Sequence, residues 1–177
     1  QAYQPFQEAI DINPQEPFYR DELSFTNAML SVTAFQQKEA TLSSQLAQEA
    51  IFQNQKALDI SPVNINFYKT QTKVYYTLSF DQKALSSLQK AKTLAPTDPK
   101  ITYNIALLYS RLDKNQEAIK TLEEAIALKP NYQDARYALA LFSHEAGKKK
   151  EAIAQLEYIL KYISPTDKQI QEKLKEW

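Results

Sequence analysis

The sequence predicts an all-α fold built from repeated pairs of antiparallel helices, and three features of its 177 residues indicate this. The chain has a single glycine, which argues against the tight turns and bulges that β-rich folds need. Pro62, Pro96 and Pro130 follow one another at equal intervals. Alanine recurs at the same interval, at Ala50, Ala84, Ala118 and Ala152. A helical hairpin of about 34 residues, repeated along the chain, follows from these spacings.

The composition excludes several classes of function. The chain has no cysteine, one histidine (His144) and one glycine (Gly147), which excludes thiolate and two-imidazole metal sites and glycine-rich phosphate loops. Its 21 basic residues equal its 21 acidic residues in number, whereas nucleic-acid-binding domains usually carry a basic excess. No apolar run approaches the roughly 20 residues of a membrane span. We therefore expect no cofactor, no metal, no nucleic-acid partner and no direct membrane insertion by these residues.

The periodic pattern can be numbered by placing the three prolines at position 32, which gives units 31–64, 65–98, 99–132 and 133–166. Position 20 is alanine in all four units, position 27 is alanine in the first three and Ile159 in the last, and position 24 is leucine in the last three. Position 8 is alanine in the last two units, where position 7 is Ile105 or Leu139, and position 11 is tyrosine in the second and third. This pattern resembles the tetratricopeptide repeat (TPR) family, most strongly over 99–166. The resemblance implies a right-handed superhelical solenoid of antiparallel helix pairs, in which small residues allow close approach and large residues fill the space between helices.

Within a single TPR domain over 1–177, each regular unit is expected to hold helix A near positions 1–14 and helix B near 16–30. Proline at position 32 ends helix B because it cannot continue the hydrogen-bond ladder. The regular units are 65–98, 99–132 and 133–166. Residues 164–177 are expected to form a C-terminal capping helix, since 167–176 are largely polar.

The N-terminal part of the chain departs from this regular pattern. Residues 1–16 are a predicted half repeat with helix B only, at about 2–13, because Ala9 and Pro14 have the spacing of Ala57 and Pro62. The interval from Pro14 to Pro62 exceeds a standard unit by about four helical turns. We interpret 17–64 as one enlarged hairpin with helices at about 17–36 and 39–60, each roughly two turns longer than usual. The alternative is a standard unit with a separate short helix.

The sequence also predicts how some helices begin and end. Asp98 precedes Pro99, which is typical of an N-cap followed by proline at the first helical position. Two later pairs resemble capping boxes, Asn131 with Asp134 and Ser164 with Asp167. Gly147 falls between helices A and B of the last unit, where a residue with positive φ can end helix A. Ser79 and Asp113 hold the same place in earlier units without a glycine.

The TPR resemblance implies a concave groove that binds a peptide or partner protein, lined by helix-A positions 2, 5, 6, 9, 12 and 13. Twelve side chains, called here the predicted groove residues, occupy such positions: Asn66, Lys69, Lys73, Tyr76, Lys100, Tyr103, Asn104, Leu107, Arg111, Tyr137, Leu141 and His144. Aromatic rings with adjacent polar groups suit peptide binding. Tyr103 and Tyr137 lie one repeat apart and are expected to stack on one wall. Tyrosine and asparagine at positions 5 and 6 are also common in TPR scaffolds, so Tyr103 and Asn104 have both interpretations.

One TPR subclass binds the C-terminal carboxylate of heat-shock chaperones through five polar residues. Lys69 and Asn104 match that set, whereas Lys73, Asp134 and Ala138 depart from it. The chaperone clamp is therefore not predicted. A peptide with anionic groups near the lysines remains compatible with the sequence.

A catalytic His144 would need a nucleophile and an orienting carboxylate in the same pocket, and its neighbour Glu145 points elsewhere on a helix. We therefore predict no catalytic residue and a non-catalytic protein-interaction module. The alternative is a structural spacer or assembly domain of a larger protein, self-associating through the N-terminal half repeat.

Residues 13–24, followed by an enlarged hairpin, also resemble the soluble C-terminal region of some bacterial O-antigen polymerase/ligase-like membrane proteins. That resemblance implies a membrane-anchored parent protein, with this domain on a soluble face of the membrane. The other interpretation places the domain in the cytoplasm.

Overall fold

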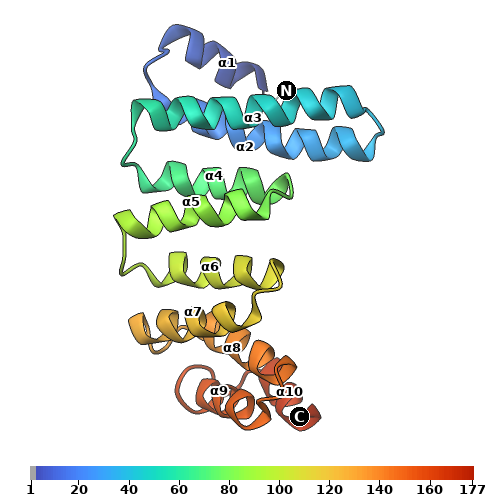
Figure 1. The fold of residues 1–177 in the computed structure, drawn as a ribbon, viewed down its shortest axis with the longest axis vertical. Helices are drawn as coiled ribbons and strands as arrows, with labels where there is room; N and C mark the ends of the chain where they lie inside the picture. The colour runs from blue at the N-terminus through green and yellow to red at the C-terminus, as the bar shows by residue number, and fades with distance from the viewer. Residues whose placement is uncertain (1–2) are drawn as a thin grey trace. The chain divides into compact units, whose positions relative to one another are not determined.

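A computed structural model of the chain describes residues 3–177, which form ten α-helices and no strand (Figure 1). In chain order they are α1 Tyr3–Ile12, α2 Pro17–Gln36, α3 Ala40–Ile60, α4 Ile65–Thr77, α5 Asp81–Leu94, α6 Pro99–Arg111, α7 Asn115–Leu128, α8 Gln133–Glu145, α9 Lys149–Tyr162 and α10 Lys168–Glu176. The all-α class is confirmed. The grouping of these helices into one domain over 1–177 stays a prediction.

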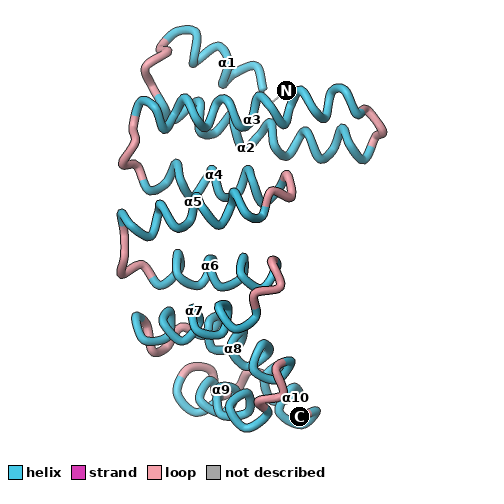
Figure 2. The backbone as a smooth tube through the Cα atoms, in the orientation of Figure 1, coloured by secondary structure: helices cyan, strands magenta, loops and turns pink. Residues whose placement is uncertain are grey.

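The helices pack as two compact units, Gln1–Ala95 and Pro96–Trp177. In the first unit α2 pairs with α3 and α4 with α5, while α4 also contacts α2 and α3, and α1 contacts α2. In the second unit α6 pairs with α7 and α8 with α9, while α7 contacts α8 and α10 contacts α9. Short loops join successive helices (Figure 2). Each unit is therefore built from sequential antiparallel pairs.

Helix A ends in the same way in all four hairpins. Gly147 has φ 77°, as the sequence predicted, but Lys38, Ser79 and Asp113 adopt the same left-handed conformation with φ 65°, 61° and 58°. The amide that follows the left-handed residue donates to the carbonyl five residues back, as from Lys148 to Ser143 at 2.8 Å. This hydrogen bond is typical of a Schellman motif, which satisfies a carbonyl at the end of the helix.

The carbonyl of the proline between hairpins accepts a hydrogen bond from the side chain six residues later. Four pairs do this: Arg20 with Pro14, Tyr68 with Pro62, Arg136 with Pro130, and Gln171 with Pro165. Each bond ties the turn to helix A of the next hairpin, or to α10 in the last case. The residue at position 4 of helix A therefore holds the turn as well as packing against its neighbours.

The enlarged hairpin has the form that the proline spacing predicted. Helices α2 and α3 have 20 and 21 residues, whereas α8 and α9 have 13 and 14. Each helix of the first pair is thus seven residues, or about two turns, longer. An arginine of the first helix donates to a glutamine of the second helix in both hairpins. Arg20 and Gln53 are 33 positions apart, whereas Arg136 and Gln155 are 19 apart. The difference of 14 residues is the length of the insertion. The alternative with a separate short helix is wrong.

The insertion lies at the end of the hairpin. Lys38, the left-handed residue, comes 18 positions after Arg20, whereas Gly147 comes 11 positions after Arg136. Seven of the 14 inserted residues therefore lie between Arg20 and Lys38, and the other seven lie between Lys38 and Gln53. We call residues 31–44 the hairpin extension. In Figure 1 it projects beyond the adjacent pair α4–α5.

The cap predictions have mixed outcomes. The carboxylate of Asp98 accepts from the amides of Lys100 and Ile101, which confirms this N-cap. The two capping boxes are wrong. Helix α8 begins after Tyr132 without a side-chain cap, and Asn131 accepts from Tyr158 instead. Helix α10 is capped by Asp167, while the Ser164 hydroxyl donates to Gln133. In both cases the side chain expected to cap the helix forms a hydrogen bond with a residue distant in sequence, which the local sequence does not reveal.

Candidate functional site

Four of the predicted groove residues lie on α4 in the first unit. Asn66, Lys69, Lys73 and Tyr76 follow one another at intervals of three or four residues, so they lie along one stripe of the helix. Asn66 and Lys73 are exposed, and Tyr76 is 47% exposed. The Lys73 Nζ atom lies 5.6 Å from the centre of the Phe25 ring, within cation–π range. The stripe therefore presents amide, ammonium and aromatic groups together.

Phe25 belongs to this surface although the sequence analysis did not include it. It lies on α2, eight residues after Pro17, which corresponds to helix-A position 9 when the enlarged unit is numbered from 17. The inserted residues shift the repeat numbering in this unit, so the sequence did not indicate its groove positions. Arg20 follows Pro14 by the same six residues that separate Arg136 from Pro130. Numbering this unit from that proline places Phe25 at position 9.

Five of the predicted groove residues lie on α6 in the second unit. Lys100, Asn104 and Arg111 are exposed, whereas Tyr103 and Leu107 are half-buried. These five residues recur at intervals of one to four positions along one side of α6.

The predicted stacking of Tyr103 on Tyr137 is wrong. The Tyr103 ring packs instead on Tyr132, with ring centres 5.3 Å apart, and no ring contact joins it to Tyr137 among residues 3–177. It also contacts the core cluster that contains Leu122 and Leu139. Burial, followed by the Asp134 carboxylate, raises the pKa of Tyr103 above its usual value. Much of this ring therefore serves the scaffold.

The last three predicted groove residues lie on α8 and are half-buried. His144 stacks on Trp177 with ring centres 4.2 Å apart and an angle of 6° between the planes. Tyr137 packs against the cluster of Ala140, Leu156, Ile159 and Ile170, which Trp177 also contacts. Leu141 is half-buried nearby on the same helix. The last turn of the chain thus covers part of the surface that the sequence assigned to a ligand.

A buried carboxylate lies at the junction of α2, α3 and α4. Asp21 is 4% exposed and accepts hydrogen bonds from Asn54 Nδ2 at 3.0 Å and from Thr70 Oγ1 at 2.7 Å. Asn54 Nδ2 also donates to the Phe67 carbonyl, while Asn54 Oδ1 is buried without a hydrogen bond. Desolvation outweighs the two hydrogen bonds and raises the pKa of Asp21 to about 6.

The sequence did contain a sign of this polar network. Asn54 occupies repeat position 24, where the later units have Leu88, Leu122 and Leu156, all at most 2% exposed. A buried amide in place of leucine requires hydrogen-bonding partners. The residues described include no group of three or more carboxylates or imidazoles that could hold a metal ion. None of the ten helices described combines the length and apolar character needed to cross a membrane.

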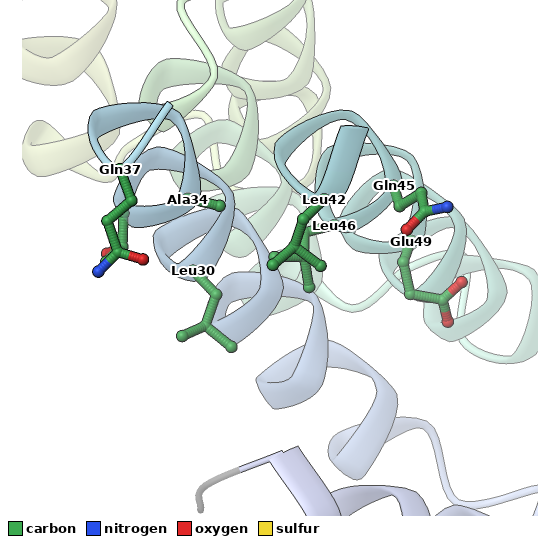
Figure 3. A pocket seen from close by; sticks show the side chains of 8 residues that line it. Leu30, Ala34, Gln37, Leu42, Gln45, Leu46 and Glu49 are labelled. Atoms are coloured by element: carbon green, nitrogen blue, oxygen red, sulfur yellow. The ribbon is translucent and has the colours of Figure 1, made fainter. Parts of the chain in front are cut away.

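A hollow of about 570 Å³ lies between α2 and α3 near the end of the enlarged hairpin. Figure 3 shows side chains of both helices around it, among them Leu30 and Ala34 from α2 and Leu42 and Leu46 from α3. Its polar lining residues are Thr33, Gln37, Gln45 and Glu49. No spacing or motif in the sequence pointed to this hollow.

Comparison with known proteins agrees with the repeat pattern. The family model for the tetratricopeptide repeat matches residues 111–171. Residues 111–171 thus match the tetratricopeptide repeat pattern. No curated protein sequence matches it significantly.

Solved TPR structures show the same fold over nearly the whole chain. MamA is 18% identical with a TM-score of 0.69, and the alignment covers 99% of this chain and 90% of MamA. A thermophilic TPR protein from Thermus thermophilus is 22% identical with a TM-score of 0.62, over 99% and 88% of the two chains. YrrB, a TPR protein with an unusual peptide-binding site, is 17% identical with a TM-score of 0.64, over 96% and 79%. The chain therefore has the TPR fold.

Proposed function

We propose that this TPR protein is a non-catalytic interaction module that binds a peptide or a partner protein through the predicted groove residues. The observation that carries the proposal is the α4 stripe, where Lys73 lies over Phe25 and Tyr76 is 47% exposed. Exposed aromatic rings beside cations are frequent energetic centres of protein interfaces. Within the second unit, the exposed Asn104 on α6 separately presents an amide that can bond a peptide backbone. The peptide-binding site of YrrB supports the same use of the fold.

The proposed ligand is a peptide that carries both an apolar or aromatic side chain and an acidic group. Tyr76 would contact the former, and Lys73, beside the half-buried Phe25 ring, would pair with the latter. The half-buried Tyr103, Tyr137 and His144 contribute less, because each packs against residues of its own unit. Specificity therefore rests on the exposed members of the predicted groove residues.

The test is selection of binders from a phage-displayed peptide library, followed by fluorescence anisotropy with one selected peptide. Tyr76→Ala and Lys73→Ala should each weaken its binding about tenfold or more, which corresponds to roughly 1.4 kcal/mol. Matched controls on exposed faces of helix B are Lys90→Ala on α5 and Lys120→Ala on α7, which should leave the affinity within twofold. If the helix-B variants lose binding and the α4 variants do not, the groove assignment is wrong.

The second candidate function is a structural spacer or assembly domain of a larger, membrane-anchored bacterial protein of the O-antigen polymerase/ligase type. The feature that favours it is residues 13–24, which run into the first helix of the enlarged hairpin. Sequencing the parent gene upstream of the codon for Gln1 tests this. A run of membrane spans would support the proposal, and a soluble enzyme domain there would contradict it.

A further inference from the structure

The buried carboxyl of Asp21 lies next to the α4 stripe within the first compact unit. Thr70 of α4 donates its hydroxyl hydrogen to Asp21 Oδ2 at 2.7 Å. Lys73 of α4 lies over the Phe25 ring of α2, with its Nζ atom 5.6 Å from the ring centre. Phe25 comes one helical turn after Asp21, and Lys73 one turn after Thr70. The buried acid and the lysine proposed to hold a peptide therefore lie on neighbouring turns of one contact between α2 and α4.

Thr70 is the hydrogen-bond partner of Asp21 that can respond to its charge. The other partner, Asn54 Nδ2, can only donate, whereas a hydroxyl can donate or accept. An ionised Asp21 holds the hydrogen of Thr70. A protonated Asp21 can instead donate its own hydrogen to Thr70 Oγ1, which leaves the threonine hydrogen for another acceptor. Thr70 is half-buried at helix-A position 6, one of the groove positions, so a bound peptide can supply that acceptor.

The charges around Asp21 are few. Lys73 favours the ionised carboxyl and the adjacent Glu22 opposes it, but burial has the largest effect and raises the pKa to about 6. Helix α3 presents the uncharged Asn54 to the carboxyl. The other charged residues of α1 to α4 are Glu8, Asp11, Lys56 and Asp59, which are exposed, Arg20 and Glu49, which bond Gln53, and the half-buried Lys69.

We propose that Asp21 makes peptide binding by the α4 stripe depend on pH, so that an acidic peptide binds more tightly when Asp21 is protonated. This inference rests on the proposed function. The ionised carboxylate repels the acidic group of a peptide near Lys73 and retains the Thr70 hydrogen. Protonation removes the repulsion and lets Thr70 donate to the peptide. Because coupling between two binding events is reciprocal, the bound acidic group in turn favours the protonated form of Asp21.

The direction of the effect follows from the pKa of Asp21. Since that pKa is about 6, affinity for an acidic peptide should be greatest at about pH 5 and should fall as the pH rises through 6. Lysine side chains keep their charge over this range. The single histidine of the chain, His144, lies in the second compact unit and is the group against which Asp21 must be controlled.

Fluorescence anisotropy at about pH 5 and about pH 7.5 tests the proposal with a peptide selected from the phage library, which is panned at both pH values. The peptide is acetylated and free of histidine, so its own charge stays nearly constant. The wild type should bind it about three- to tenfold more tightly at the lower pH. A version of the peptide with its acidic residues replaced by their amides should lose most of this difference.

Asp21→Asn separates the charge of Asp21 from other effects of pH. Its amide is uncharged, and its Nδ2 atom can donate to Thr70 as a protonated carboxyl would. The variant should bind the peptide at both pH values as the wild type does at the lower one. His144→Gln is the control and should keep the full pH dependence. Circular dichroism at both pH values checks that each variant is folded.

The pKa of Asp21, followed by carbon-13 NMR of its carboxyl group, is a second readout that a purely structural role would not move. Saturating peptide should raise this pKa, and so should Lys73→Gln, whereas Lys90→Gln on the exposed surface of α5 should leave it unchanged.

Two results would overturn this inference and leave the proposed function intact. One is binding that depends on Tyr76 and Lys73 but has the same affinity at both pH values. The other is a pH dependence that persists undiminished in Asp21→Asn. If no selected peptide depends on Tyr76 and Lys73 at either pH, the proposed function fails, and this inference fails with it.

Discussion

Asp21 is a residue whose environment opposes its charge. It lies at the junction of three helices, 4% exposed, and two hydrogen bonds only partly compensate for the loss of hydration. The group binds its proton more tightly in the folded chain, with a pKa of about 6, than in the unfolded chain, where the ordinary value is 3.8. The stabilisation associated with protonation is therefore fully present below pH 3.8 and is lost as the pH rises through 6.

Asp21→Asn should remove this pH dependence. The free energy of unfolding of the wild type, measured relative to this variant, should fall by about 3 kcal/mol between pH 3.8 and neutral pH. Urea denaturation followed by circular dichroism at several pH values measures the difference. Asp59→Asn, an exposed carboxylate on α3, is the control and should give a difference that does not vary with pH. A constant difference for Asp21→Asn as well would contradict the prediction.

The residues with positive φ between helices A and B differ in the backbone strain that they carry. A side chain with a Cβ atom is strained in this conformation, whereas glycine is not. Asp113→Gly should therefore raise the free energy of unfolding by about 0.5–1 kcal/mol, and Gly147→Ala should lower it by about 1 kcal/mol. A Cβ atom at Gly147 would meet no atom within 4 Å, so any loss there reports the backbone alone. Chemical denaturation at fixed pH measures both.

The control for Asp113→Gly is Ser86→Gly, in the exposed interior of α5. The same new residue should destabilise there by about 0.5–1 kcal/mol, because glycine is a poor helix former. Opposite signs at the two sites are the expected result. Destabilisation at both would mean that the left-handed turn does not strain Asp113.

At the scale of elements, Arg136 connects α8, α9 and the preceding turn. Its Nε atom donates to the Pro130 carbonyl at 2.7 Å, its guanidinium bonds Gln155, and its Cζ atom lies 3.4 Å from the centre of the Tyr158 ring. Arginine suits this position because its planar group can donate in several directions while stacking on an aromatic ring. The same bonds to the proline and the glutamine recur at Arg20 in the first hairpin.

Arg136→Lys should lower the free energy of unfolding by about 1–3 kcal/mol, since an ammonium group cannot replace both hydrogen bonds and the stacking contact. Thermal or urea denaturation measures the change. Lys120→Arg, the reverse exchange at an exposed position of α7, is the control and should change stability by less than about 0.5 kcal/mol. Equal effects at the two sites would show that the hydrogen bonds and stacking contact of Arg136 contribute no net stability.

At the scale of the whole molecule, each compact unit contains its own hydrophobic clusters. In Pro96–Trp177, one cluster joins α6, α7 and α8, and another joins α8, α9 and α10. Stability in repeat proteins is approximately a sum of terms within repeats and between neighbours. A fragment of residues 96–177 should therefore fold alone, helical by circular dichroism and with a cooperative thermal transition below that of the full chain.

A fragment of residues 131–177 is the control. It keeps α8, α9 and α10 but loses Ile119, Leu122 and Ala125 from the first cluster, so it should be largely unfolded. If 96–177 is also unfolded, its clusters do not suffice without the first unit. A single transition of the full chain would then favour the proposal of one domain over 1–177.

Much of the fold could be predicted because it depends on periodic spacing. Evenly spaced prolines and alanines indicated the helix pairs, and the longer interval between Pro14 and Pro62 indicated two additional turns on each helix of the first hairpin. The candidate site was less predictable. The predicted groove residues lie on the expected helices, but Tyr103 and His144 have partners, Tyr132 and Trp177, that no spacing rule relates to them. Local patterns likewise misplaced the caps at Asn131 and Ser164.

The sequence by itself therefore determined the helices, their pairing and the length of the enlarged hairpin, because hydrogen-bonded periodicity and helix breakers act over a few residues. Only the tertiary structure decided which side chains remain available. The Asp21 carboxylate is buried from solvent because three helices meet around it. Trp177 stacks on His144 because α10 packs against the preceding helix pair. Leu30 and Leu42, near the end of the enlarged hairpin, stay partly exposed in the described structure. Such burial and exposure depend on contacts between residues distant in sequence, which composition and spacing do not encode.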